Sequence, residues 1–180
     1  TDGSIGVCTN TTAPGQVFNE IEEKNRRFVS VLGSLIVSRD GTERMILNSL
    51  AHPTMNYLIL FSEESLTFSP STNLLLAIQN GIDESREGNY ISGGKAASAH
   101  LPNLSAPIID AFRENIIVLP LFMYQSDFSR EVIDEYLEWI QEKIPKELYE
   151  FLKEANQKKK IYYNYLNELI SLLSTLPQKE

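Results

Sequence analysis

Tyr57-Leu58-Ile59-Leu60-Phe61 is the stretch that decides the fold, because a short apolar run between polar segments is typical of a strand buried on both faces. Strands of this kind lie inside parallel sheets, where helical crossovers cover both faces. The sequence on either side of this run indicates further strands at Ile5–Cys8, Phe28–Leu32 and Ile116–Leu119, and a weaker one at Asn89–Ser92. Leu35–Val37 is a short apolar run beyond Gly33, where we expect a bend or a strand end.

Helical spacing appears between these strands. Inward faces are expected on Val17, Phe18 and Ile21; on Met45, Ile46, Leu47 and Leu50 in a helix that starts near Asp40; and on Ile108, Ile109 and Phe112. A further helix is expected over 71–79, closed by Asn80-Gly81. Alternating strands and helices predict parallel βαβ units with right-handed crossovers. The predicted fold class is therefore α/β: a Rossmann-like three-layer domain with a mostly parallel sheet.

The pattern of apolar residues along the chain changes after Gln125. From there apolar residues recur at helical spacing up to Pro145, and a second periodic segment runs over 146–176. We therefore predict a Rossmann-like domain over 1–125 and a C-terminal helical extension over 126–180. The extension offers a surface for a second copy of the chain or for another protein partner.

Composition excludes several functional classes. The 180 residues include 16 Lys+Arg and 24 Asp+Glu, and the net charge of −8 argues against nucleic acid as a partner. One Cys and two His rule out an internal disulfide and leave few metal ligands, so no metal site is expected. No apolar run approaches the roughly 18 residues of a membrane span, and no signal peptide is evident. A cytoplasmic location is expected, and the sequence leaves open whether the chain is a domain excised from a longer protein.

The predicted ligand site lies at the carboxyl ends of the strands, where open parallel sheets bind their ligands. The loops to consider follow Cys8, Phe61 and Ser92, and a small molecule is the expected ligand class. From these loops the candidate cofactor-binding residues are Cys8, Thr9, Asn10, Glu64, Thr67, Phe68, Ser69, Gly93, Gly94 and Lys95.

Each candidate also has a structural interpretation. The hydroxyls of 9–12 would bind a phosphate or amide, or cap the following helix. Glu63 and Glu64 would supply a general base, or only be solvated. The segment 93–95 would admit an anion beside Lys95, or form a plain loop. Cys8 would be a reactive thiolate near a helix N-terminus, or a small buried side chain.

Residues 4–119 carry a succession of short motifs: Val7-Cys8-Thr9, Gly41-Thr42-Glu43-Arg44 before Met45-Ile46, Leu58-Ile59-Leu60 followed by Glu64, Asn80-Gly81, and Ile91 before Gly93-Gly94-Lys95. In order and spacing this succession resembles the soluble domain of the corrinoid-carrying subunit of tetrahydromethanopterin S-methyltransferase, the A-subunit, and its uncharacterised archaeal and bacterial relatives. That subunit carries its corrinoid within a methyl-transfer complex.

The resemblance implies a Rossmann-like fold and a corrinoid whose cobalt is bound by a His in the loop after the central strand. In this chain the Gly-His pair of that loop corresponds to Thr67-Phe68, and Ser69-Pro70-Ser71 follows. Phe68 has no lone pair to give to cobalt. The tail also lacks the membrane anchor of the membrane-bound members.

Three functions are compatible with the sequence. The first is a domain like this methyltransferase subunit that acts as a non-catalytic binding or assembly module. The second is a corrinoid (cobalamin) binding module in methyl transfer, without a protein His ligand. The third is an enzyme acting on a pterin or nucleotide with Glu63, Glu64 and Lys95, so the sequence leaves open whether the chain is an enzyme.

Overall fold

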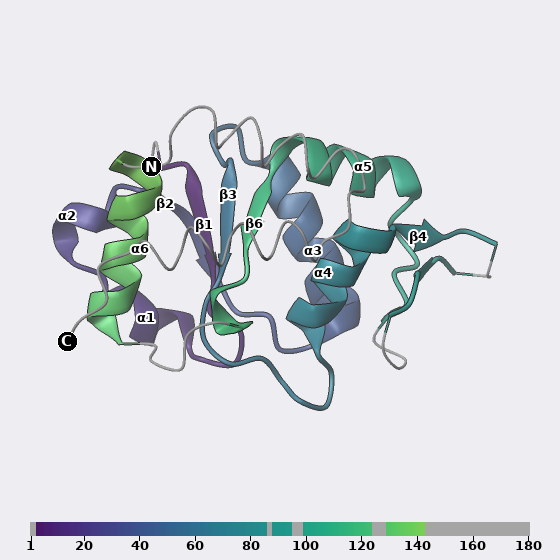
Figure 1. Cartoon of the computed structure of the whole chain (residues 1–180), viewed down its shortest axis with the longest axis horizontal. Helices are drawn as coiled ribbons and strands as arrows, with labels where there is room; N and C mark the ends of the chain where they lie inside the picture. The colour runs from purple at the N-terminus through teal and green to yellow at the C-terminus, as the bar shows by residue number, and fades with distance from the viewer. Residues whose placement is uncertain (1–2, 86–87, 95–98, 124–128, 143–180) are drawn as a thin grey trace.

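The computed structural model describes residues 3–85, 88–94, 99–123 and 129–142, and it confirms the predicted Rossmann-like α/β fold (Figure 1). Four parallel strands form the sheet in the order β2-β1-β3-β6. They are β1 (Ile5–Cys8), β2 (Val29–Gly33), β3 (Tyr57–Leu60) and β6 (Ile117–Leu119). The predicted central strand is confirmed, because Leu58, Ile59 and Leu60 of β3 are all buried between two neighbouring strands.

Helices cover both faces of the sheet and make three layers (Figure 1). One layer holds α1 (Pro14–Glu20), α2 (Glu23–Arg26) and α6 (Arg130–Glu142); the other holds α3 (Ser38–Ala51), α4 (Pro70–Asn80) and α5 (Ala106–Asn115). A 3-10 turn (Leu121–Met123) follows β6. No helix in the described ranges is long and apolar enough to cross a membrane.

The strand register brings the carboxyl ends of the strands to one edge of the sheet. Cys8, the last residue of β1, is level with Gly33 of β2 and Leu60 of β3. The loops that leave these three strands therefore start side by side. In Figure 1 this edge is the lower one, where the loop after β3 extends beyond the sheet before it enters α4.

The expected strand over 89–92 does not belong to this sheet. The strand found there, β5 (Tyr90–Ile91), pairs antiparallel with β4 (Ile82–Asp83) in a two-stranded hairpin beside α4, on the side away from the sheet (Figure 1). Gly81 ends α4 with a φ of 75°, and the chain turns there into β4. The strand β5 therefore pairs with β4, its neighbour in sequence. The loop that starts at Gly93 is therefore separate from the edge where β1 and β3 end.

Several element boundaries and faces also differ from the predictions. Helix α3 begins at Ser38 instead of Asp40. The expected strand end at Gly33 is confirmed, because β2 ends there and Leu35–Val37 forms no strand. Phe18 and Leu47, both expected to face inward, are 42% and 41% exposed. Phe18 lies outside the core, and the Arg26 guanidinium is 4.5 Å from its ring centroid. This cation–π contact covers one face of the exposed ring.

Helix α6 is part of the α/β domain. Its Ile133 and Leu137 are fully buried in the common core, and Gln141 donates a 2.8 Å hydrogen bond to Ser4 at the start of the chain. The packing of the α/β domain thus continues past the predicted boundary at 125/126. Residues 143–180, including the predicted helix over 146–176, lie outside the described residues, so the role of this segment stays a prediction.

Candidate functional site

The candidate site lies between β1 and β3, where the order in which successive strands are added to the sheet reverses. The connection from β1 leads to one edge at β2, whereas the next connection returns past β1 to β3. In open α/β sheets such a switch point opens a crevice at the carboxyl ends of the strands. Loop 9–13 and loop 62–69 meet at this place.

Asn10 joins the two loops from a fully buried position. Its Nδ2 donates to the Ser62 carbonyl oxygen at 2.8 Å, and its Oδ1 accepts from Ser71 Oγ at 2.6 Å and from Cys8 Sγ at 3.4 Å. The amide of Asn10 therefore connects the end of β1, the loop after β3 and the first turn of α4. A buried amide whose nitrogen and oxygen both bond within the protein is a structural link.

The threonines of loop 9–13 are also engaged within the protein. Thr9 Oγ1 donates to the Thr12 carbonyl oxygen at 2.7 Å, and Thr12 Oγ1 lies 2.5 Å from Ser62 Oγ. Thr11 donates both its N–H (3.2 Å) and its Oγ1 (2.8 Å) to the Glu63 carbonyl oxygen. The predicted capping role is wrong, because α1 has Ala13 at its N-cap without a side-chain hydrogen bond.

Non-glycine residues with left-handed backbone gather around the same edge. The φ angles are 46° at Asn10, 69° at Ser62 and 43° at Ser69. Such conformations cost of order 1–3 kcal/mol each and often mark functional loops. Ser62 and Ser69 stand at the two ends of loop 62–69, so the sharp turns define how this loop projects from the sheet.

Cys8 carries a buried thiol. Its side chain is 1% exposed, and burial raises its pKa to about 12, which outweighs the opposing effect of the Asn10 backbone. A nucleophilic or metal-binding cysteine needs an accessible thiolate. The structure therefore favours the interpretation of Cys8 as a small core side chain.

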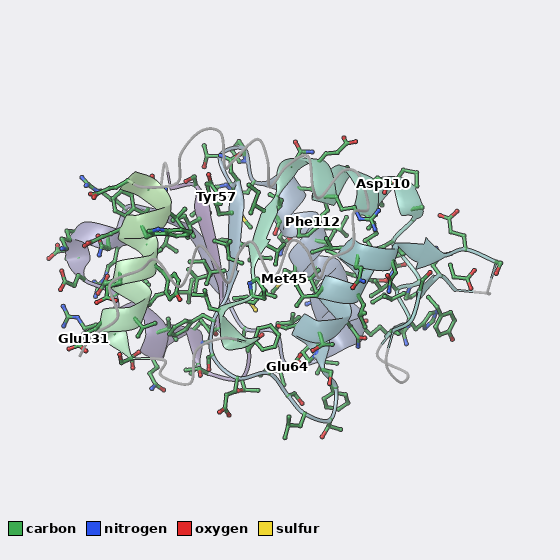
Figure 2. All side chains as sticks on the ribbon, in the orientation of Figure 1. Met45, Tyr57, Glu64, Asp110, Phe112 and Glu131 are labelled. Carbon is green, nitrogen blue, oxygen red and sulfur yellow. The ribbon has the colours of Figure 1, made fainter. Side chains whose placement is uncertain are left out.

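Glu64 holds the N-terminus of α4. Its carboxylate accepts hydrogen bonds from the Thr72 N–H at 3.0 Å and from the Thr72 hydroxyl, whereas the N-cap residue Ser69 makes no side-chain cap. Figure 2 shows Glu64 where the loop after β3 approaches the helix. A carboxylate in this position complements the helix dipole. Glu63 points its exposed side chain to solvent, and the two adjacent carboxylates thus have different environments.

The tip of loop 62–69 exposes apolar side chains. Leu66 is 95% exposed and Phe68 is 42% exposed, and Thr67 between them is exposed as well. The backbone below the tip is fixed, because the Ser69 N–H donates to the Ser65 carbonyl oxygen at 2.7 Å and Asn73 Nδ2 donates to the Phe68 carbonyl oxygen at 3.4 Å. The loop tip therefore presents two exposed apolar side chains on a backbone held by hydrogen bonds.

The remaining candidates lie elsewhere. Gly93, with a φ of 76°, and Gly94 follow the β4–β5 hairpin, and a Cβ on Gly94 would come within 2.4 Å of Ala99 Cβ. The need for glycine at these two positions is thus explained by local backbone and packing. Lys95 lies outside the described residues. The structure links the candidates at 8–10, through Asn10, to Ser62 and Ser71 on either side of the candidates at 64–69, and it places Gly93 and Gly94 apart from them.

The described residues at this edge do not fit a cobalt ligand set. Phe68 has no donor atom, and no cluster of three or more His, Cys, Asp or Glu suitable for a metal occurs in the described part of the chain. His52 follows α3 and precedes β3, which places it at the opposite edge of the sheet, and His100 stacks on Tyr90 of the hairpin with ring centroids 4.8 Å apart. Neither imidazole can reach the loop after β3.

Sequence reasoning missed the partners that complete this network. Ser62 hydrogen-bonds to Asn10 and Thr12, and Ser71 donates a hydrogen bond to Asn10. These partners are 50 to 61 residues apart along the chain. Glu43, 4% exposed on α3, likewise accepts from Asn103 N–H at 2.9 Å and Asn103 Nδ2 at 2.8 Å and fixes the segment before α5. A carboxylate beside apolar positions of a helix is the one local signal that could have indicated such a buried role.

Comparison with known proteins identifies similar chains. No known protein-family profile matches the chain. It is 24% identical over 108 residues to a protein from Methanosarcina mazei that is named as the A-subunit of the putative methyltransferase Mtx, a match that covers 59% of this chain and 61% of that protein. The proteins of the same name from Methanosarcina acetivorans and Methanosarcina barkeri are 24% and 26% identical over 108 and 87 residues; these matches cover 59% and 48% of this chain and 53% and 43% of those proteins.

The chain thus spans about half the length of the curated relatives it matches. The similarity confirms the resemblance to a methyltransferase A-subunit that the succession of motifs indicated. Together with the Rossmann-like fold, it relates this chain to methyltransferase-associated proteins that are named as one subunit of such an enzyme.

Proposed function

We propose that this chain is a non-catalytic binding module of a methyl-transfer assembly, and that it contacts another protein of that assembly through the tip of loop 62–69. The observation that carries the proposal is that the tip of this loop exposes apolar side chains. Where the resembling family keeps a metal-binding His, this chain presents Phe68 next to the almost fully exposed Leu66. Exposed apolar side chains on a fixed backbone are suited to contact with a partner's apolar pocket.

The chemistry of the edge supports a binding role. Three groups of the kind that catalysis uses are engaged within the protein. The Cys8 thiol is buried with a raised pKa, the Glu64 carboxylate caps α4, and the Asn10 amide bridges two loops. The relatives are named as one subunit of a methyltransferase, which supports the expectation that partner subunits exist.

Site-specific photo-crosslinking in the source organism tests this proposal. A benzoylphenylalanine at position 66 of the full chain is expected to give one covalent adduct, and Phe68→Ser in the same chain is expected to reduce it strongly. The same crosslinker at exposed Gln16 of α1 is the control and should give no such adduct. An adduct of equal yield from position 16, or an adduct from position 66 that Phe68→Ser leaves unchanged, would contradict the proposal.

A second candidate is corrinoid binding without a protein ligand to the cobalt. It is favoured by the apolar side chains of Leu66 and Phe68, which could lie against a corrin ring. A titration of the full chain with hydroxocobalamin, followed by visible absorption and thermal shift, decides it. Binding is expected without a nitrogen-ligated spectrum, and Phe68→His is expected to change the spectrum of the bound corrinoid. Absence of binding at high micromolar concentration by both proteins would exclude this candidate.

A further inference from the structure

A groove lies on the α3 side of the sheet, between the ends of β1 and β2 and helix α3, and has a volume of about 320 Å³. This volume lies at the lower end of the range for small-molecule sites, roughly 300–1,000 Å³. Residues from the strands and from the helix line it in about equal numbers: Val7, Cys8, Val31, Gly33, Ser34, Asp40, Gly41, Arg44, Met45, Asn48, Ser49 and Leu58. The loop tip at Leu66 and Phe68 is not part of this lining.

Among the described residues, no positive φ and no close packing contact requires glycine at position 33. Its φ is outside the positive range that favours glycine, and a Cβ built on it would meet no atom within 4 Å. Glycine weakens a strand because it has no side chain to pack and loses more backbone entropy on folding. Gly33 is the last residue of β2 and lines the groove, so any larger side chain at this position would occupy groove space that glycine leaves open.

The groove combines an apolar floor with free polar groups at its rim. Cys8, Leu58 and Met45 contribute buried or half-buried apolar surface, and Met45 extends from α3 toward the sheet in Figure 2. At the rim, the guanidinium of Arg44 and the side-chain amide of Asn48 make no hydrogen bond or ion pair with any other described residue. Asp40, the acidic residue of the lining, has Arg39 3.6 Å away.

A slot between a helix and a sheet accepts a flat body, and a thioether such as that of Met45 contacts aromatic rings favourably. Arg44, which pairs with no other residue in the described ranges, adds a planar fork of donors that matches a carboxylate or phosphate. We propose that this groove binds a small planar aromatic molecule that carries one anionic group, with its ring over Gly33 and its anion at Arg44. This site is separate from the loop that the proposed function uses, and its existence does not depend on that function.

A titration of the ¹⁵N-labelled full chain with 2-naphthoate, followed by amide chemical shifts, tests the proposal. The neutral probe 2-naphthalenemethanol has the same ring system without the charge. Saturable shifts are expected at Gly33, Gly41 and Met45 with both probes, with tighter binding of the anion. Arg44→Gln should weaken 2-naphthoate by roughly tenfold, the effect of one charge-assisted contact, and leave the alcohol unchanged.

The variant that fills the groove is Gly33→Leu. It should abolish binding of both probes while the thermal midpoint stays the same or rises, since the new side chain enters open space. Gly15→Leu is the matched control, because a Cβ at Gly15 also meets nothing within 4 Å but lies on α1 in the opposite layer (Figure 1). This variant should bind both probes normally.

Three outcomes would overturn the proposal. One is undiminished binding to Gly33→Leu. Another is equal affinity for both probes together with no effect of Arg44→Gln, which would show a nonspecific apolar patch. The third is groove amide shifts that depend on protein concentration before any probe is added, which would place a second copy of the chain in the groove.

Discussion

At the scale of single residues, burial decides what the reactive side chains of the strand-end loops can do. Cys8 and Glu64 carry functional groups common in active sites, but one is enclosed by the core and the other is occupied by a helix N-terminus. Both therefore contribute to stability, and each contribution can be measured separately.

Cys8 makes the stability of the fold depend on alkaline pH. The pKa of its thiol rises from 9.0 to about 12 on burial, so the folded protein holds this proton more tightly than the unfolded chain. The resulting stabilisation is complete below pH 9 and is lost as the pH rises toward 12, by up to about 1.4 kcal/mol per pH unit. Urea unfolding of the native protein and of Cys8→Ala between pH 8 and 11 should show a stability difference that decreases above pH 9. Parallel curves would contradict this expectation.

Glu64 should matter for stability far more than its neighbour Glu63. Replacing Glu64 with Ala removes the acceptor for both Thr72 donors, and loss of a helix cap costs about 1–2 kcal/mol. Glu63→Ala is the control, because its exposed carboxylate bonds to no other described residue. Chemical unfolding of both variants at neutral pH checks the prediction, which an equal loss in the two variants would refute.

At the scale of elements, the junction between α2 and α6 joins distant parts of the chain. Asp134 of α6 is 7% exposed, and its two carboxylate oxygens each lie 3.1 Å from the Glu22 N–H at the start of α2. Its Oδ1 also accepts from Asn25 Nδ2 at 2.7 Å. Helix α2 has four residues and no side-chain cap of its own at Glu22, so α6 supplies the cap.

Asp134→Ala should therefore loosen both helices together. The substitution removes the charged acceptor of the Glu22 N–H and one of the two charged acceptors of the Asn25 amide, which keeps Glu138 Oε1 at 3.1 Å. Hydrogen bonds to charged groups are worth about 1.5–3 kcal/mol each. We expect a loss of about 2–3 kcal/mol in the free energy of unfolding, together with faster amide exchange in 22–26 and 130–142. Glu142→Ala, an exposed change in the same helix, is the control. Faster exchange confined to α6 would show that α2 does not depend on the cap.

At the scale of the whole molecule, α6 completes one of the three layers, so the α/β domain should require the chain up to residue 142. A chain that ends at Gln125 would leave uncovered the surface that Ile133, Leu137 and Ile140 fill. At about 25 cal/mol per Å² of apolar surface, this loss is comparable with the whole stability of a domain. Circular dichroism melts should show cooperative unfolding for a chain ending at Glu142 and none for one ending at Gln125. Cooperative unfolding of the shorter chain would contradict this assignment of α6.

The sequence predicted the parts of the fold that have local periodicity. The run at 57–61, the alternation of strands and helices and the stop at Asn80-Gly81 all correspond to observed elements. The weak strand expected over 89–92 corresponds to β5, but β4 and its antiparallel pairing with β5 were missed, because a strand of two residues carries no periodic pattern. The bridge from Asn10 to Ser62 was missed because a contact across 52 residues depends on the register of the finished sheet. The position of Gly93 and Gly94 also depends on strand pairing, because β5 pairs with β4 and not with the main sheet. These two candidates therefore lie apart from the candidates at the ends of β1 and β3.

The position of α6 also has a consequence for how the protein is made. The ribosome delivers the chain from the N-terminus, so β1, β2 and β3 emerge long before α6 is complete. Until then α1 and α2 cover their face of the sheet without Ile133, Leu137 and Ile140. The nascent chain therefore exposes an apolar surface through most of its synthesis, and this interval is when it is most exposed to aggregation and most dependent on chaperones.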